Sequence, residues 1–335
     1  MRVCCVIVTY GDRWQLVEKV VKEAFHQGVN RLVLIDNGSW EKSRNMIKQL
    51  SSRYAESLVL HRFDCNEGSA RAFKYGLKTA RQLDCEYIWL LDDDNLPEAH
   101  ALDALKDFWT KNERRKDGLF ALSSLRSDRL VFRQALQTRK ADALLWPKNS
   151  FLGFHLRQVS SKIRERIFPV QSEQTLERTA LKIDAAFYGG LFIHREILDK
   201  IGYPDEDLVL YSDDFCFTYP ITLKQGEIWL VPESAVKDID TPFYLPVKKG
   251  FLYHSSLDAE NDVQIYYATR NSVYCTRKYF ITNRLTYFMN KMVFLLLITG
   301  IGMLRGKFKR LKLIFEAIHD GEQQQLGRNP KYKLK

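Results

Sequence analysis

The chain has 335 residues, of which 45% are apolar and 27% are charged, and its formal net charge is +10. This composition is typical of a globular protein with a sizeable core, and it excludes a largely disordered or fibrous chain. Much of the positive charge lies beyond residue 240, which indicates an anionic partner such as a membrane surface or a nucleic acid.

Strand-like and helix-like segments alternate through the first third of the chain. Apolar runs of strand length are followed by segments with apolar residues at helical spacing. The expected strands cover residues 2–9, 32–35, 58–62 and 87–91, and the expected helices cover 12–27, 42–54 and 69–83. This order predicts an α/β fold with a doubly wound, mostly parallel sheet and helices on both faces.

Polar residues follow the carboxyl end of each of these four strands. The clusters are Thr9-Tyr10-Gly11, Asp36-Asn37-Gly38-Ser39, Asn66-Glu67-Gly68-Ser69 and Asp92-Asp93-Asp94. Any one of them would be read as a turn. In a doubly wound sheet, however, all four would lie at the edge where ligands bind, so together they indicate a binding site.

The run of three aspartates carries the strongest chemical signal. The first and third residues of an extended segment point to the same side, so Asp92 and Asp94 are expected to grip one cation while Asp93 points elsewhere. Carboxylate oxygens suit Mg²⁺ or Mn²⁺, which often share them with substrate phosphates. The alternative is a solvated acidic turn that caps the following helix.

The middle of the chain is less regular. A strand is expected at 119–125, whereas 126–178 is polar, basic and aromatic by turns and gives no clear pattern. A strand-like run at 183–193 contains Gly189 and Gly190, and glycines in a strand indicate close approach by a ligand or by another backbone.

A second pair of carboxylates, Asp213-Asp214, lies in the next segment. The stretch 217–224 has helical character, although Pro220 argues against a helix there. A short strand is expected at 228–231.

The carboxyl-terminal region has an apolar segment between cationic residues. The uncharged run 292–304 has thirteen residues, fewer than the roughly twenty needed to span a bilayer, and Lys291 and the basic stretch 305–312 flank it. This pattern indicates a helix lying on an anionic membrane surface. A buried helix of a small bundle is the alternative.

Six scattered cysteines form no CxxC pair, so reduced thiols and a cytosolic protein are expected. No signal-peptide pattern precedes the first strand, which also favours a cytoplasmic location.

These motifs occur in an order that resembles the nucleotide-sugar glycosyltransferases of family 2, which are inverting enzymes with the GT-A fold. The matching residues are Val8-Thr9-Tyr10, Asp36-Asn37-Gly38-Ser39, Asn66-Glu67-Gly68 with Ala70-Arg71, Asp92-Asp93-Asp94, Gly189-Gly190-Leu191-Phe192, Asp213-Asp214 and Tyr267-Ala268-Thr269-Arg270-Asn271. The ending, with Asp320-Gly321 and Leu326-Gly327, is similar to that of bacterial members acting on lipid-linked polysaccharide intermediates. The triple aspartate is similar to the galactofuranosyltransferase branch.

The resemblance implies a role for each motif. Asp214 would be the catalytic base that deprotonates the acceptor, and Asp213 would orient it. Asp92 and Asp94 would hold Mn²⁺ or Mg²⁺ against the diphosphate. The residues implied in nucleotide-sugar binding are Thr9, Tyr10, Gly11, Asp36, Asn37, Asn66, Gly68, Arg71, Asp92 and Asp93. Those implied on the acceptor side or in phosphate binding are Gly189, Gly190 and Arg270, with an ion pair to a core acid as the alternative for Arg270.

The chain departs from the family pattern at one point. Relatives often carry a metal-binding histidine some two dozen residues after the base, and no histidine stands there in this sequence. Asp238 is the expected substitute as third metal ligand, with His254 as a second candidate.

The resemblance therefore implies a catalytic domain over 1–240, with a nucleotide-sugar half at 1–125 and an acceptor half at 126–240, and a helical extension over 241–335. It would transfer a hexose to a lipid-linked glycan of a bacterial surface polysaccharide at the inner face of the membrane. UDP-galactofuranose is the first donor to consider and dTDP-rhamnose the second.

Two other classes fit the residues less well. A nucleotidyltransferase would need a glycine-rich, basic phosphate loop after the first strand, which Thr9-Tyr10-Gly11-Asp12 does not supply. A nucleic-acid-binding protein would need aromatic stacking positions among its cations, and here a long apolar run lies among them, so no nucleic-acid partner is expected.

Overall fold

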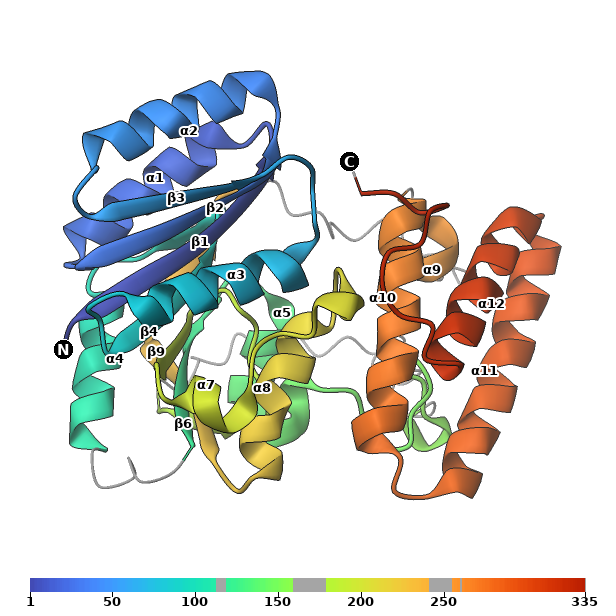
Figure 1. The fold of residues 1–335 in the computed structure, drawn as a ribbon. Coiled ribbons are helices and arrows are strands. Elements are labelled where there is room, and N and C mark those ends of the chain that lie inside the picture. Colours follow the sequence, from blue (N-terminus) through green and yellow to red (C-terminus); the bar gives the residue numbers. More distant parts are fainter. Residues whose placement is uncertain (113–118, 159–178, 241–254, 260, 335) are drawn as a thin grey trace.

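The structure is a computed structural model, and it describes residues 1–112, 119–158, 179–240, 255–259 and 261–334. Strands and helices alternate in its first part (Figure 1). The elements are β1 Val3–Gly11, α1 Trp14–His26, β2 Arg31–Ser39, α2 Glu41–Arg53, β3 Leu58–Phe63, α3 Ser69–Gln82, β4 Tyr87–Asp92, β5 Asn95–Pro97 and α4 Ala101–Lys111. The alternation and the strand positions expected from the sequence are confirmed over this region.

The second part adds shorter strands to the same sheet. Its elements are β6 Phe120–Leu125, α5 Leu130–Thr138, β7 Leu181–Ile183, β8 Leu191–His194, α7 Ile197–Ile201, α8 Asp213–Leu223 and β9 Glu227–Asp238. The strand order is β3-β2-β1-β4-β8-β6-β9-β5, with β7 paired to β9. Strands β3, β2, β1 and β4 run parallel, whereas β8 runs antiparallel to both of its neighbours. The predicted α/β class, with its largely parallel sheet, is confirmed.

Each face of the sheet is covered by its own apolar cluster. Along β1, Val3, Cys5 and Ile7 point to one face, while Cys4 and Val6 point to the other, as alternation along a strand requires. The first cluster includes buried residues of α1, α2 and α4, and the second includes those of α3, α5, α7 and α8. These two layers fix the sheet rigidly behind the loops at its carboxyl edge.

Several expected boundaries are wrong. The strand-like run 183–193 is two strands, β7 and β8, because the segment between them leaves the sheet. Helix α8 starts four residues earlier than expected and passes through Pro220, since burial of the neighbouring Phe217 and Ile221 offsets the lost backbone hydrogen bond.

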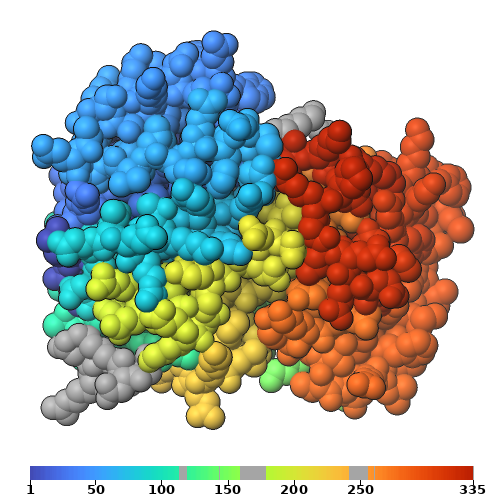
Figure 2. All heavy atoms as spheres, in the orientation of Figure 1, coloured from blue at the N-terminus to red at the C-terminus, as the bar shows by residue number. Residues whose placement is uncertain are grey.

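The carboxyl-terminal region is helical, as expected, and packs beside the sheet domain (Figures 1 and 2). It consists of α9 Ser255–Asp258, α10 Asp262–Cys275, α11 Arg284–Leu304 and α12 Phe308–Glu322, with a π-helical turn at Thr276–Phe280. The thirteen-residue run lies within α11, whose 21 residues make it long and apolar enough to cross a membrane by length and composition. The expectation that this segment is too short is therefore wrong, because the helix begins eight residues before the run.

Candidate active site

Strand register brings the predicted site residues to one level of the sheet. Thr9 on β1 is paired with Asp36 on β2, and the preceding residue, Val8, is paired with Asp92 on β4. Asp36 is in turn paired with Arg62 on β3. The polar clusters predicted at four strand ends therefore meet at one edge, where ligands of doubly wound sheets bind.

Arg13, in the turn between β1 and α1, organises two of the three aspartates. Its Nε donates to both oxygens of Asp93, at 3.0 and 2.9 Å, and its Nη2 donates to Asp94 at 3.1 Å. Asp93 also accepts a 2.7 Å hydrogen bond from the Thr9 hydroxyl. Asp93 thus ties β1 to β4 from inside the fold, while Asp92 is the most exposed of the three.

A second arginine group lies on the other side of the aspartate run. Asp238, at the end of β9, accepts hydrogen bonds from Arg126 and from Arg129 Nε, the latter at 2.9 Å. It also accepts one from Asn95 at 2.9 Å. Arg126 Nη1 lies 3.6 Å from Asp92. The third-ligand role expected for Asp238 would therefore require these arginines to release it, and the alternative, His254, lies outside the described residues.

Carboxylates outnumber guanidiniums in the ion pairs that the described residues form at this edge. Asp92, Asp93, Asp94, Asp238 and Asp240 pair with Arg13, Arg126 and Arg129. Burial, then Asp92 and Asp93, raise the pKa of Asp94 to about 7. A divalent cation would relieve this repulsion.

The donor set at this edge fits a hard cation. Among the described residues no three acidic, histidine or cysteine side chains are grouped so as to hold a metal by themselves. Mg²⁺ and Mn²⁺ sites that share substrate phosphates need only one or two protein carboxylates, and Asp92 and Asp94 supply two.

The loops after β2 and β3 are joined by one amide side chain. Asn37 donates to Asn66 Oδ1 at 3.0 Å and accepts from the Glu67 backbone N–H at 2.8 Å. Asp36 is buried, accepts from the Ser39 backbone N–H at 2.8 Å, and lies 3.8 Å from Arg62. Cross-linking of this kind holds the two loops in a fixed relation at the predicted nucleotide end of the site.

The other residues predicted to bind the nucleotide lie around these loops. Tyr10 is partly exposed and the Arg13 guanidinium lies over its ring at 5.3 Å, while Gly11 faces open space with φ +63°. Arg71, one turn into α3, pairs with Glu67 at 2.8 Å. These side chains are accessible to a ligand from solvent.

The two predicted glycines allow elements to approach closely. A Cβ on Gly189 would lie 1.9 Å from Asn95 Oδ1 and 2.9 Å from Asp92 Oδ2, so a larger residue there would displace these side chains. Gly190 has φ +95° and abuts Ser124. The backbone between β7 and β8 therefore forms the wall next to Asp92.

Asp213 and Asp214 occupy the first turn of α8, where a helix N-terminus favours negative charge. Asp213 is buried and accepts a 2.8 Å hydrogen bond from Ser69 at the start of α3. Burial raises the pKa of Asp213 to about 6 against the opposing effect of Ser69. Burial and then the Asp213 charge raise the pKa of Asp214 to about 8, and Asp92 adds to both shifts. The Asp213–Asp214 pair and Asp92 therefore interact electrostatically across the site.

Arg270 has a different environment from the phosphate site expected for it. Its side chain is buried in the helical region and donates to the backbone oxygens of Gly327, Asp207 and Leu208 and to Asn271 Oδ1. The alternative was an ion pair between Arg270 and a core acid. These hydrogen bonds do not form one, because all of their acceptors are neutral oxygens. This geometry favours a structural role.

Several residues of the site were missed from the sequence. Arg13 and Arg126 each stand one or two residues beyond the end of a strand, the same kind of position as the predicted polar clusters. Ser69 belongs to a predicted polar cluster, but its pairing with Asp213 and that of Asn95 with Asp238 gave no signal, because the partners are 144 and 143 residues apart.

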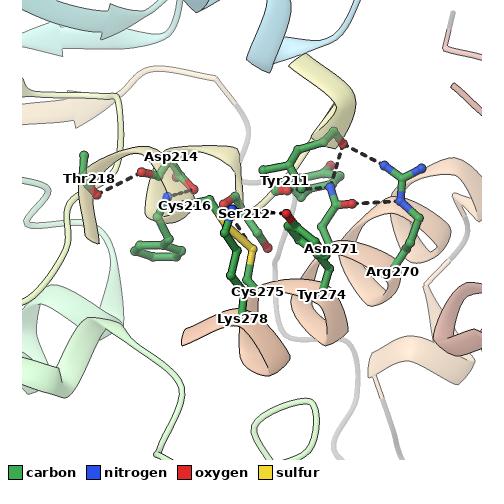
Figure 3. Close-up of a disulfide and its surroundings, with 12 residues drawn as sticks. Tyr211, Ser212, Asp214, Cys216, Thr218, Arg270, Asn271, Tyr274, Cys275 and Lys278 are labelled. Carbon is green, nitrogen blue, oxygen red and sulfur yellow. Dashed lines mark hydrogen bonds between the residues drawn. A yellow bond between two sulfur atoms is a disulfide. The ribbon is translucent and has the colours of Figure 1, made fainter. Parts of the chain in front are cut away.

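Cysteine pairing also differs from the expectation. Cys216 in α8 and Cys275 in α10 form a disulfide (Figure 3), whereas Cys4, Cys5, Cys65 and Cys85 are free. The prediction of six reduced thiols is therefore wrong, because the fold brings together two cysteines 59 residues apart.

Solved structures of known proteins share this fold. The chain is similar to GalNAc-T7 in complex with UDP, GalNAc and Mn²⁺, with TM-score 0.52, 15% identity, and coverage of 81% of this chain and 47% of that one. It is also similar to S. aureus TarS 1–349 in complex with UDP-GlcNAc, with TM-score 0.50, 14% identity, and coverage of 96% and 81%. The chain thus spans about half the length of the GalNAc-T7 structure. No curated protein matches it in sequence.

The fold and the edge residues define the class, a GT-A-type α/β domain. Residues 4–167, just under half of the chain, match the model of glycosyl transferase family 2. This region, which contains β1 to β4 and the aspartate run, is therefore similar to that family.

Proposed function

We propose that the protein is a metal-dependent, inverting glycosyltransferase that uses a nucleoside diphosphate sugar. The observation that carries the proposal is the facing arrangement of two acidic groups. The Asp92–Asp94 run lies at the ligand edge, and the Asp213–Asp214 pair lies close enough for Asp92 to raise its pKa values.

The donor would bind across the ends of β1 to β4. Thr9, Tyr10, Asp36, Asn37 and Asn66 line the nucleotide end, with Gly11, Gly68 and Arg71 beside them. Asp92 and Asp94 would hold Mn²⁺ or Mg²⁺, which supplies neutralising charge to the departing nucleoside diphosphate. GalNAc-T7, similar in fold, was crystallised with UDP and Mn²⁺, which supports a UDP-sugar and this metal.

Asp214 is the proposed general base. A carboxylate with a pKa near 8 is a stronger base than an exposed aspartate, so it can take the proton from an acceptor hydroxyl as the new bond forms. Asp213, held by Ser69, would orient the acceptor. A single base with no covalent sugar intermediate gives inversion of the anomeric centre.

We propose a lipid-linked glycan as acceptor and an anionic membrane surface as the place of reaction. Helix α11 buries Asn290, Phe294, Ile298 and Gly302 against the other helices, at intervals of four residues. Its opposite face would be polar in an ordinary surface helix. Instead it exposes large apolar side chains: Leu285, Phe288, Met289, Met292, Leu296, Leu297, Met303 and Leu304.

Cations flank this apolar face, with Arg284 at its start and Lys309 and Lys312 just beyond its end, all of them exposed. Apolar area edged with positive charge suits the headgroup region of an anionic bilayer. The cytoplasmic side remains a prediction of the sequence. The Cys216–Cys275 disulfide argues against a cytoplasmic location, because reducing compartments rarely preserve such bonds.

The experiment that tests the proposal is transfer to a synthetic lipid-linked acceptor, followed by NMR of the product. UDP-galactofuranose is the first donor and dTDP-rhamnose the second. The expected product has the anomeric configuration opposite to that of the donor and is absent with Asp214→Asn. A product that retains the donor's configuration would contradict the single-base mechanism.

A further inference from the structure

The segment just before the catalytic pair has an unfavourable backbone. Residues Val209, Tyr211 and Ser212 have φ values of +66°, +67° and +63°, in the left-handed region. Side chains with a Cβ disfavour this region, and a branched valine disfavours it most. Such a conformation persists only where its surroundings hold it. Whatever holds this segment therefore sets the position of Asp213 and Asp214.

Asn271 of α10 is the side chain that holds it. Its Nδ2 donates to the carbonyl oxygens of Leu208, Leu210 and Tyr211, at 2.7, 2.8 and 2.8 Å (Figure 3). Two N–H bonds are thus shared among three carbonyls, and the side chain is 0% exposed. Without this amide, water would have no access to replace the lost hydrogen bonds.

Arg270 fixes the orientation of that amide. Its Nε donates to Asn271 Oδ1 at 2.9 Å, so the amide oxygen is engaged and the amino group faces the segment. The Arg270 guanidinium also donates to Asp207 and Leu208 carbonyls at 3.1 Å. The side chains of Arg270 and Asn271 therefore both donate hydrogen bonds to the backbone of residues 207–211.

The same helix is attached on the far side of the catalytic pair. Cys275 lies four residues after Asn271, on the same face of α10, and forms the disulfide with Cys216 in α8. In the sequence, the pair Asp213–Asp214 lies between these two attachment points, residues 208–211 and Cys216.

Residues 208–211 also contact the loop between β3 and α3, at the predicted nucleotide end of the site. The Val209 carbonyl accepts a hydrogen bond from the Ala70 backbone N–H at 3.3 Å, and a Cβ on Gly68 would lie 2.1 Å from that oxygen. Ser69, between these two residues, holds Asp213. A shift of 208–211 would therefore displace the base relative to the donor.

We propose that Asn271 is a positioning residue, which acts through the backbone of 208–211 to hold the Asp213–Asp214 pair at the donor site. This assignment rests on the proposed transferase function. It goes beyond that function because it makes the carboxyl-terminal helical region a working part of the catalytic centre.

The test compares Asn271→Ala with Asn290→Ala in the full chain. Asn290 is a matched control: it is 1% exposed, lies in α11, and bonds to backbone at Asn149 and Leu156 rather than to residues 208–211. Each variant is measured for kcat, for donor KM, and for amide hydrogen exchange of residues 207–214. Asn271→Ser, which keeps one donor, replaces the alanine variant if that variant does not fold.

With Asn271→Ala we expect kcat to fall by about 100-fold, the cost of a small misplacement of a reacting group, with donor KM within about threefold of wild type. Exchange at 207–214 rises in this variant alone. Equal losses of kcat in both alanine variants, or faster exchange with kcat unchanged, would overturn the proposal. If wild type transfers no sugar, the proposed function fails, and the exchange of 207–214 still decides whether Asn271 holds the segment.

Discussion

Asp214 and Asp213 are adjacent carboxylates with different partners. Asp213 is held by Ser69, whereas Asp214 bonds only locally, to the Phe215 backbone N–H, among the contacts of the described residues. Because burial and the Asp213 charge raise the pKa of Asp214, the pair separates into an orienting group and a base.

This difference predicts a pH dependence. A general base works only when deprotonated, so kcat/KM of wild type should rise with pH and level off above about 8. Asp213→Asn removes one of the charges that raise the pKa of Asp214, so its profile should rise at lower pH. Rate profiles from pH 5 to 9.5 check this. An identical midpoint in both proteins would contradict the electrostatic coupling.

At the scale of elements, α8 and α10 are joined by the only disulfide within the described part of the chain. Closing a loop of 59 residues removes freedom from the unfolded chain, and the usual contribution of such a bond is about 2–4 kcal/mol.

Replacing both bridge cysteines, Cys216→Ser with Cys275→Ser, should therefore lower the free energy of unfolding by about 2–4 kcal/mol. Cys65→Ser, at an exposed free thiol, should change it by less than about 0.5 kcal/mol. Denaturant unfolding of the three proteins makes the comparison. Equal stability of wild type and the double variant would mean that the bridge does not constrain the chain.

Helix α11 makes a second prediction at this scale. Leu296 and Leu304 are 69% and 79% exposed on its outer face, and Leu130 on α5 is similarly exposed at 68%. Leu296→Asp with Leu304→Asp should reduce cosedimentation with vesicles of anionic lipid by about tenfold, since burial of leucine in the bilayer is lost and negative charge is added.

Leu130→Asp is the matched control and should bind vesicles as wild type does. Binding of wild type should weaken in high salt and on neutral lipid, because the cations at both ends of α11 contribute. Wild-type binding that survives both aspartate substitutions would remove α11 as the membrane contact.

Prediction from sequence succeeded where the signal was local. The apolar pattern of the sequence located β1 to β4, and the register of these strands places Thr9, Asp36 and Asp92 at one edge of the sheet. It failed where pairing spans the chain, as for Arg13 with Asp240, which are 227 residues apart. For α11, the expectation of a segment too short to span a bilayer was wrong, because the helix begins at Arg284, before the uncharged run.

At the scale of the whole molecule, the acidic groups affect stability in a predictable direction. The folded state raises the pKa values of Asp94, Asp213 and Asp214 to about 7, 6 and 8, from an ordinary value of 3.8. Folding therefore favours their protonated forms. Their contribution to stability is present in full below about pH 4 and is lost progressively as pH rises from about 4 to about 8.

Asp214→Asn should remove part of this loss of stability at higher pH. Without added metal, the variant should gain stability relative to wild type between pH 5 and pH 8.5, as measured by denaturant unfolding at each pH. Asp84→Asn, at an 82% exposed side chain paired with Arg2, is the surface control. A constant difference between wild type and Asp214→Asn would contradict the burial of a charged group at that position.

The most direct test of the whole account is release of nucleoside diphosphate from a donor panel in the presence of Mn²⁺. The panel contains UDP-galactofuranose, UDP-galactopyranose, UDP-glucose, UDP-N-acetylglucosamine and dTDP-rhamnose, assayed with membrane extract as the source of acceptor. Wild type is expected to release one nucleoside diphosphate selectively, with loss of release on EDTA addition and in Asp94→Ala. Release that persists both with EDTA and in Asp94→Ala would contradict the metal role of the aspartate run.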